Sequence, residues 1–205
     1  MESGEPNLVG RDSRGCDQAK RTWLLPYLTD ERSKAMSNHF DAQGRPVMVE
    51  VTDKPNTHRR AVARALIAMQ PATRESIQTG AGRKGDVLQV ATLAGIQAGK
   101  HCSHWIPLCH PIPLDSLTVH FHWRDDGLLE CVAEAATIWR TGVEMEAMTA
   151  VSAAALTVYD MVKGIDRWTE IRSISLMKKE GGKQGNLQHP EWREGKSAGE
   201  AEGSG

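Results

Sequence analysis

The chain has 205 residues and a formal net charge of -1 at pH 7, so it lacks the strong basic excess that is typical of proteins that coat nucleic acids. Hydrophobic residues make up 40% of the sequence but aromatic residues only 5%, which predicts an aliphatic core and helices packed closely through small side chains. No stretch approaches the roughly 18 consecutive apolar residues of a membrane span and no signal peptide is recognisable, so we expect a cytoplasmic protein.

The polar ends of the chain contrast with its middle, which indicates three segments. Residues 1–36 mix glycine, serine, proline and charged residues without a sustained period, and we expect a mobile N-terminal extension there. Residues 186–205 are polar and rich in glycine, a composition that is typical of disordered tails. The sequence therefore predicts one domain, residues 37–185, between two extensions.

The first half of this domain is predicted to be mainly helical. A short strand is expected over residues 46–51, followed by a helix over residues 57–69. Pro71 interrupts that helix before a shorter piece that ends near residue 80, and a further helix is expected over residues 86–100. A threonine and an aspartate at the first positions of the two longer helices can cap their N-termini.

A β-hairpin is predicted after these helices. Apolar and polar side chains alternate over residues 117–123, which is the two-residue period of a half-buried strand. Two aspartates and a glycine at residues 125–127 have the composition of a tight turn. The return strand is expected over residues 128–139.

One long helix and a last strand complete the domain. Thr141 and Glu144 have the spacing of a capping box, which opens a helix to about Ile165, and a strand is expected over residues 169–177. The order strand, helices, strand, strand, helix, strand is the split βαβ arrangement of ferredoxin-like α+β folds, in which an antiparallel sheet packs against helices. Because that fold hosts many functions, function has to be argued from individual residues.

The long helix carries a carboxylate and an ammonium group one turn apart, Asp160 and Lys163. Together with Glu146 and Thr149 they lie on or near one stripe of the helix surface. Two interpretations stay open. The pair is either a solvated intrahelical ion pair, or it lies in a cleft where each group tunes the pKa of the other and one of them transfers a proton.

Lysines near the ends of three elements are candidate anion ligands. Lys84 precedes a helix start, where unpaired backbone N–H groups attract phosphates, although an exposed turn explains it as well. Lys100 ends that helix, where the helix dipole alone would favour a cation. Lys179 belongs to a basic, glycine-rich stretch, residues 178–185, which can wrap a phosphate chain or serve as a flexible linker.

Histidines and cysteines gather among prolines in residues 100–113. Their spacing matches no zinc-binding pattern, so no metal site is predicted. The prolines favour a rigid loop that holds His110 in a fixed place, and a purely structural histidine is the alternative. Because nothing marks the chain for export, we expect its four cysteines to be reduced thiols.

Several segments taken together resemble one family closely, the cyclic pyranopterin monophosphate synthases of molybdenum cofactor biosynthesis (the MoaC family). The segments follow the order expected for that family over roughly three quarters of the chain, which is far more specific than any single motif. They are HFD at His39, MVEV at Met48, KGDV at Lys84, AGIQAGK ending at Lys100, IPLCHP at Ile106, TGVEMEAMTA at Thr141, LTVYDMVK ending at Lys163 and GGKQG at Gly181.

The resemblance implies an activity and a set of site residues. A cyclised guanosine triphosphate would lose pyrophosphate and rearrange to cyclic pyranopterin monophosphate, so residues 37–185 would be the catalytic domain of a lyase that requires no cofactor. Asp160 would be the catalytic acid/base and Lys163 its neighbour. The substrate-binding residues implied by the resemblance are Lys84, Lys100, Leu108, Cys109, His110, Glu144, Met145, Glu146 and Lys179.

The resemblance also implies self-association as a homohexamer, a trimer of dimers, with active sites completed across subunit contacts and with no nucleic-acid or membrane partner. Two rival classes of function are kept beside it. One is a noncatalytic ferredoxin-like oligomer that senses a nucleotide through its lysines. The other is a zinc hydrolase built on His101, Cys102, Cys109 and His110.

Overall fold

The computed structural model describes residues 39–80 and 85–192. The chain divides into two compact units, residues 1–45 and 46–205. In the first unit the described part is a turn, in which the Asp41 carboxylate accepts hydrogen bonds from the backbone N–H groups of Gln43 and Arg45. The sheet and the helices belong to the second unit.

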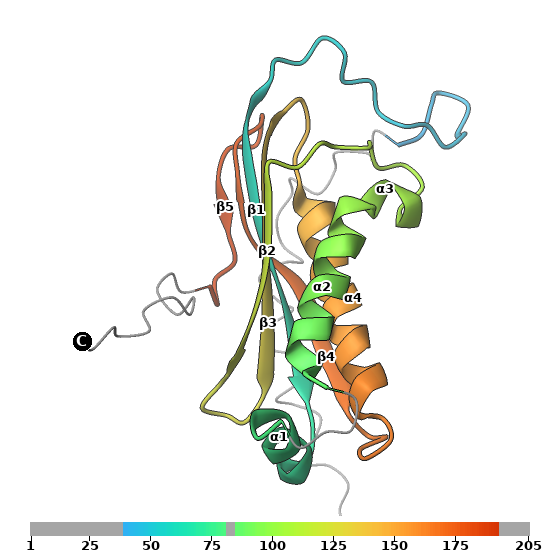
Figure 1. Ribbon diagram of the computed structural model, residues 1–205. Helices are drawn as coiled ribbons and strands as arrows, with labels where there is room; N and C mark the ends of the chain where they lie inside the picture. Colours follow the sequence, from blue (N-terminus) through green and yellow to red (C-terminus); the bar gives the residue numbers. More distant parts are fainter. Residues whose placement is uncertain (1–38, 81–84, 193–205) are drawn as a thin grey trace, which may run out of the picture. The chain divides into compact units, whose positions relative to one another are not determined.

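Five strands form one antiparallel sheet in the order β2-β3-β1-β4-β5 (Figure 1). The first four in this order have the arrangement of a ferredoxin-like sheet, and the short β5 is added at the β4 edge. The strands are β1 (Thr57–Ala68), β2 (Ser116–Trp123), β3 (Leu129–Trp139), β4 (Glu170–Glu180) and β5 (Leu187–Gln188).

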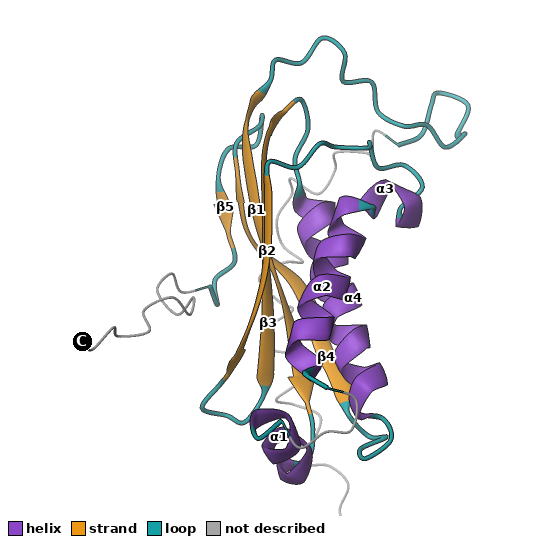
Figure 2. Cartoon of the chain, viewed as in Figure 1, coloured by secondary structure: helices purple, strands orange, loops and turns teal. Residues whose placement is uncertain are grey.

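Two long helices cover one face of this sheet (Figure 2). They are α2 (Val87–Lys100) and α4 (Glu144–Val162), and the shorter α1 (Pro71–Gln78) and α3 (Cys102–Trp105) lie at their ends. The core between the layers is built from alanine, valine and leucine with few aromatic rings, as the composition predicts. No helix among the described residues is long and apolar enough to cross a membrane. The α+β fold with a split βαβ order is therefore confirmed.

The central strand β1 corrects the sequence prediction, which placed a helix over residues 57–69. This segment is rich in alanine, a strong helix former, but it pairs with β3 on one side and β4 on the other. Ala61, Ala63 and Ala65 alternate on the core face, so small side chains let the helices approach the sheet. Pairing on both sides outweighs the intrinsic preference of the residues.

Two further predictions of local structure were also wrong. Residues 46–51, expected to be a strand, form no strand, and β1 takes that place in the order of elements. The helix α4 begins at Glu144 rather than at Thr141, with Val143 as its N-cap and no side-chain cap. The predicted capping box does not form because the Glu144 carboxylate pairs with Lys179 of β4.

Residues 186–192 have a defined structure, although the sequence predicted a disordered tail over residues 186–205. Leu187 and Gln188 form β5, which pairs with β4, and the backbone N–H of His189 donates a hydrogen bond to the Met177 carbonyl, 2.8 Å away. Paired backbone groups contribute to holding this segment, and a polar composition gives no sign of such pairing. Residues 193–205 lie outside the described residues.

Close contact between α2 and α4 depends on glycine. A β-carbon built on Gly95 of α2 would lie 2.9 Å from the Ala150 carbonyl oxygen of α4 and 3.2 Å from the Ala154 β-carbon. The helices therefore touch through backbone and methyl groups, which leaves no space for a larger residue at that position.

We expect Gly95→Ala to destabilise the protein by about 2 kcal/mol, although alanine is the better helix former, because the added methyl group meets a backbone carbonyl. Denaturant unfolding measures the change. The matched control is Gly164→Ala, which follows α4 and would place its β-carbon in open space. Equal stability of Gly95→Ala and wild type would contradict the close approach.

Candidate active site

The predicted site residues lie at both ends of α4. Glu144, Met145 and Glu146 begin the helix, and Asp160 lies near its end. Sixteen residues at about 1.5 Å each separate Glu144 from Asp160 by about 24 Å. Within one chain the predicted residues therefore form two separate groups, which we call the Glu146 end and the Asp160 end.

An ion pair between two elements forms the rim of the Glu146 end. The Lys179 ammonium of β4 lies 2.9 Å from the Glu144 carboxylate of α4. Antiparallel pairing with β1 places Lys179 opposite Ala61, on the side of the sheet that the helices cover. The pair thus links strand β4 to the start of helix α4.

Glu146 is the buried carboxyl group of this end, with 3% of the residue exposed. Burial raises its pKa to about 7, and the nearby charge of Glu144 acts in the same direction. A hydrogen bond from the Cys102 thiol favours the ionised form and opposes this rise. Glu146 can therefore hold or release a proton near neutral pH, which is the range that suits an acid/base group.

Cys102 connects Glu146 to a second buried group. The Thr149 hydroxyl, one turn along α4 from Glu146, donates a hydrogen bond to the Cys102 sulfur at 3.4 Å. Burial raises the pKa of the Cys102 thiol to about 12, so it is a neutral donor. Sequence reasoning named Cys102 only as a ligand of the rival zinc hydrolase, and it placed Thr149 on the Glu146 stripe without assigning it a role. The shared stripe was the signal for Thr149, whereas nothing in the spacing of residues 100–113 indicated that Cys102 would lie beside Glu146.

The loop after α3 brings Cys109 and His110 to the same end. Burial raises the pKa of Cys109, and the nearby charge of Glu146 raises it further. The Cys109 and Cys102 thiols are joined by a hydrogen bond. His110 Nε2 lies 2.8 Å from the Val49 carbonyl oxygen. Since a carbonyl only accepts, Nε2 carries a proton, and in the neutral ring Nδ1 is left as an acceptor. Leu108, in the same loop, is half-buried.

The remaining lysines predicted for the site are Lys100 and Lys84. Lys100 is exposed in the last turn of α2, as expected for a cation at a helix C-terminus. Lys84 lies outside the described residues. The helix start that follows it is capped by Asp86, whose carboxylate accepts hydrogen bonds from the backbone N–H groups of Leu88 and Gln89. That cap confirms the prediction for Asp86 and occupies two of the donors that would attract a phosphate.

The Asp160 end carries the predicted catalytic pair. The Lys163 ammonium lies 2.6 Å from the Asp160 carboxylate, and the two side chains are 52% and 62% exposed in the single chain. The hydrogen bond to Asp160 raises the pKa of Lys163, so its ammonium is charged at neutral pH. The pair forms as predicted, but the stripe that is buried at Glu146 and Thr149 reaches solvent here, so both side chains of the pair are open to solvent in the single chain.

A groove between α2 and α4 leads from one end toward the other. Its lining includes His101 near the Glu146 end, Leu156 in the middle and Asp160 at the far end. Leu156 of α4, Leu93 of α2 and Trp105 of the short helix α3 are large apolar side chains that are more than half exposed. Trp105 and Leu156 line the same groove, and exposed apolar side chains that lie close together are typical of a surface that is covered in an assembly.

A second, open depression of about 1200 Å³ lies between α1, the start of α2 and the end of α4. Thr79, Gln89 and His120 contribute polar groups to it. None of the predicted site residues in the described part of the chain lines this depression. Nor do any three or more His, Cys, Asp or Glu side chains of residues 39–80 and 85–192 group in a way that could hold a metal ion.

Comparisons with known proteins bear directly on these residues. The sequence profile of the MoaC family matches residues 48–182. The chain belongs to the MoaC family. The matched range contains every residue predicted for the site, including Lys84, and it ends before β5.

Curated members of the MoaC family match most of this chain. A cyclic pyranopterin monophosphate synthase of Thermomicrobium roseum is 49% identical over 148 residues, which cover 72% of this chain and 89% of that protein. A synthase of the same name from Syntrophomonas wolfei is 49% identical over 73% of this chain and 96% of its own. A third, from Novosphingobium aromaticivorans, is 50% identical over 72% of this chain and 93% of its own.

The raised pKa of Glu146 makes stability depend on pH. Between the ordinary value of 4.5 and about 7 the folded chain binds more protons than the unfolded chain, so the stabilisation that protonated Glu146 provides is lost as pH rises through this window. We expect Glu146→Gln to be more stable than wild type at pH 8, by at most about 3 kcal/mol, and equal to it at pH 4.

Thermal unfolding across this pH range checks the prediction. Glu75→Gln, in the exposed helix α1, is the control and should show no such dependence. A Glu146→Gln variant that is destabilised equally at pH 4 and pH 8 would show that the carboxyl group is not desolvated in the folded state.

Proposed function

We propose that this chain is a cyclic pyranopterin monophosphate synthase, a lyase that converts a cyclised guanosine triphosphate to cyclic pyranopterin monophosphate with release of pyrophosphate. The name that its curated relatives share, at 49–50% identity over nearly their whole length, is the observation that carries the proposal. The chemistry of the two ends supports it, because the reaction needs cations for a triphosphate and groups that exchange protons near neutral pH.

The roles of the residues follow from that chemistry. A hydroxyl of the substrate attacks the innermost phosphate, the bond to pyrophosphate breaks, and the hydroxyl proton passes to the Asp160 carboxylate. Lys163, whose ammonium lies 2.6 Å from Asp160, faces the charge that develops on the phosphate. Lys179, Lys100 and Lys84 bind the triphosphate.

The Glu146 end receives the part of the substrate that rearranges. Glu146 supplies a carboxyl group that is close to half-protonated at neutral pH, and the free Nδ1 of His110 accepts a hydrogen bond. Leu108, Cys109 and Met145 contact the substrate beside them. We assign no required cofactor to the reaction, since the rearrangement and the displacement at phosphorus need proton donors and acceptors but no redox centre.

We further propose that two copies build each active site. A two-fold axis across the middle of α4 places the Asp160 end of one copy beside the Glu146 end of the other. The apolar residues Leu93, Trp105 and Leu156 are then covered at the contact between copies. The homohexamer implied by the family resemblance, a trimer of such dimers, is the assembly we propose. A triphosphate does not cross a membrane unaided, so we place the reaction in the cytoplasm.

Turnover by purified protein tests the activity. We expect incubation with the cyclised guanosine triphosphate to yield the pyranopterin, measured by the fluorescence of its oxidation product. Asp160→Asn should still bind the substrate but lose at least about a hundredfold in turnover, because it cannot accept a proton. Asp125→Asn, in the exposed β2–β3 turn, is the control. A nucleotide sensor would show no turnover in any of these proteins.

Mixing two inactive variants tests the shared site. His110→Ala and Asp160→Asn change opposite ends, so a mixed dimer keeps one intact site, and random reassociation should restore about a quarter of wild-type activity. Asp160→Asn mixed with Lys163→Met, both at one end, should restore none. Equal recovery in the two mixtures, or none in either, would contradict a site built from two copies.

A further inference from the structure

A short segment at the outer edge of the sheet lies beyond the range that the MoaC family profile matches. We call residues 186–192 the strap. It begins after a turn in which Gly181, Gly182 and Gly185 have positive φ angles, and the backbone N–H of Gly181 donates a hydrogen bond to the Asn186 side chain at 3.0 Å. The turn reverses the chain, so the strap runs antiparallel along β4.

The strap meets β4 where its pairing with β1 is irregular. Leu176 pairs with Ala63 and Lys178 with Val62, so Met177 between them has no partner in β1. The strap forms hydrogen bonds with this part of β4 on the side away from β1. The His189 backbone N–H donates to the Met177 carbonyl at 2.8 Å, and β5 pairs with Lys178 and Lys179. A bulge loosens a strand locally, and a second partner strand restores hydrogen bonds there.

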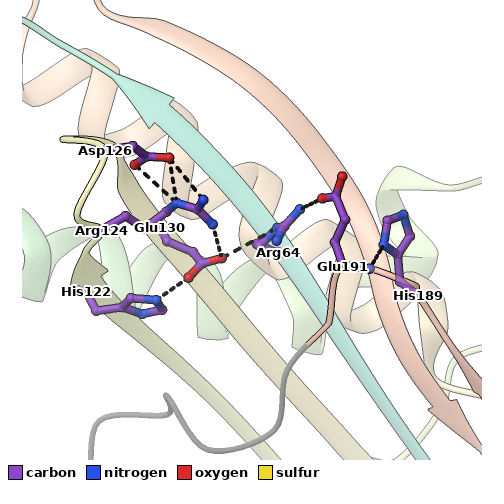
Figure 3. Close-up of polar contacts among 7 residues, drawn as sticks. All are labelled: Arg64, His122, Arg124, Asp126, Glu130, His189 and Glu191. Atoms are coloured by element: carbon purple, nitrogen blue, oxygen red, sulfur yellow. Dashed lines mark hydrogen bonds and ion pairs between the residues drawn. The ribbon is translucent and has the colours of Figure 1, made fainter. Parts of the chain in front are cut away.

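An ion pair fastens the far end of the strap to the sheet. The Glu191 carboxylate accepts a hydrogen bond from the Arg64 guanidinium of β1 at 2.9 Å. Figure 3 shows the Arg64 side chain between the carboxylates of Glu191 and Glu130. The side chains of Arg64 and Glu130 are only 7% and 9% exposed, whereas that of Glu191 is 63% exposed, so Glu191 approaches a buried guanidinium from the solvent side.

The charges around Glu130 explain why Arg64 needs Glu191. The His122 ring also contacts the Glu130 carboxylate, and the Arg124 guanidinium lies 3.7 Å from it. Glu130 is therefore shared among several donors. Arg64 Nε is buried without a hydrogen-bond partner, and it lies 3.5 Å from Glu130. A buried guanidinium is costly unless it is paired, and Glu191 supplies the closer carboxylate.

We propose that the strap is a positioning element that holds Lys179 at the active site, and that the Arg64–Glu191 pair fastens it. Lys179 connects the strap to the proposed active site, since its backbone pairs with Leu187 of the strap and its ammonium pairs with Glu144 of α4. The claim that this matters for phosphate binding rests on the proposed function. The strap thus orders one lysine that is proposed to bind the substrate.

Two truncations of the full chain separate the strap from the tail that follows it. Deleting residues 186–205 removes the strap, whereas deleting residues 193–205 leaves it in place and is the matched control. We expect the shorter chain to show a KM about tenfold higher with a smaller change in kcat, because Lys179 is no longer held in position. Glu191→Gln, which removes the charge alone, should move KM in the same direction by a smaller factor.

A double-mutant cycle shows whether the strap acts through Lys179. Affinity for pyrophosphate, the proposed product, is measured by calorimetry with and without the strap in two backgrounds. In Lys179→Met the strap deletion should have no further effect, whereas in Lys100→Met it should weaken binding as much as in wild type. Equal weakening in both backgrounds, or no effect of the deletion in wild type, overturns the proposal.

Amide hydrogen exchange gives a result that does not depend on activity. Deleting the strap, or Glu191→Gln, should speed exchange at residues 177–179 and leave α2 unchanged. Unchanged exchange at these residues means that the strap does not hold β4, even in an active enzyme. If exchange changes as expected while the full chain neither turns over the intermediate nor binds pyrophosphate, the proposed function fails and the strap's hold on β4 stands.

Discussion

The close contact of α2 and α4 over an alanine-lined sheet is the constraint on which the rest of the structure depends. Gly95 lets the two helix backbones meet, and Ala61, Ala63 and Ala65 let both approach β1. Such a core has little space to adjust, because each contact is made by a backbone or methyl group and not by a flexible side chain. The axis of α4, and with it every site residue that α4 carries, is therefore held in place.

The two ends of α4 differ in how far their ionisable side chains are buried. At its start Glu146 is buried beside the Cys102 and Cys109 thiols, so its pKa is raised to about 7. At its end Asp160 and Lys163 face solvent as a plain ion pair. An exposed pair of this kind contributes little to the stability of the fold. Leu93 of α2 and Leu156 of α4 are large apolar side chains on the same two helices that are also more than half exposed.

The outer edge of the sheet follows a different rule, because polar contacts hold it where apolar area is scarce. The bulge at Met177 interrupts pairing with β1, and the strap bonds the same strand from the other side. Arg64 and Glu191 close that segment against the sheet through charge. Backbone pairing and one ion pair thus order residues whose composition resembles a flexible tail.

The sequence by itself determined the Asp86 cap, the β2–β3 hairpin and the adjacency of Asp160 and Lys163, because local spacing and periodicity fix each of these. The resemblance of several motifs in a fixed order along the chain identified the family. Only the tertiary structure decided that the alanine-rich segment is the central strand and that Glu144 pairs with Lys179. It also decided that Cys102 lies beside Glu146 and that Glu191 reaches Arg64. Each of these depends on a partner distant in the chain, and a partner of that kind leaves no periodic signal in the residues around it.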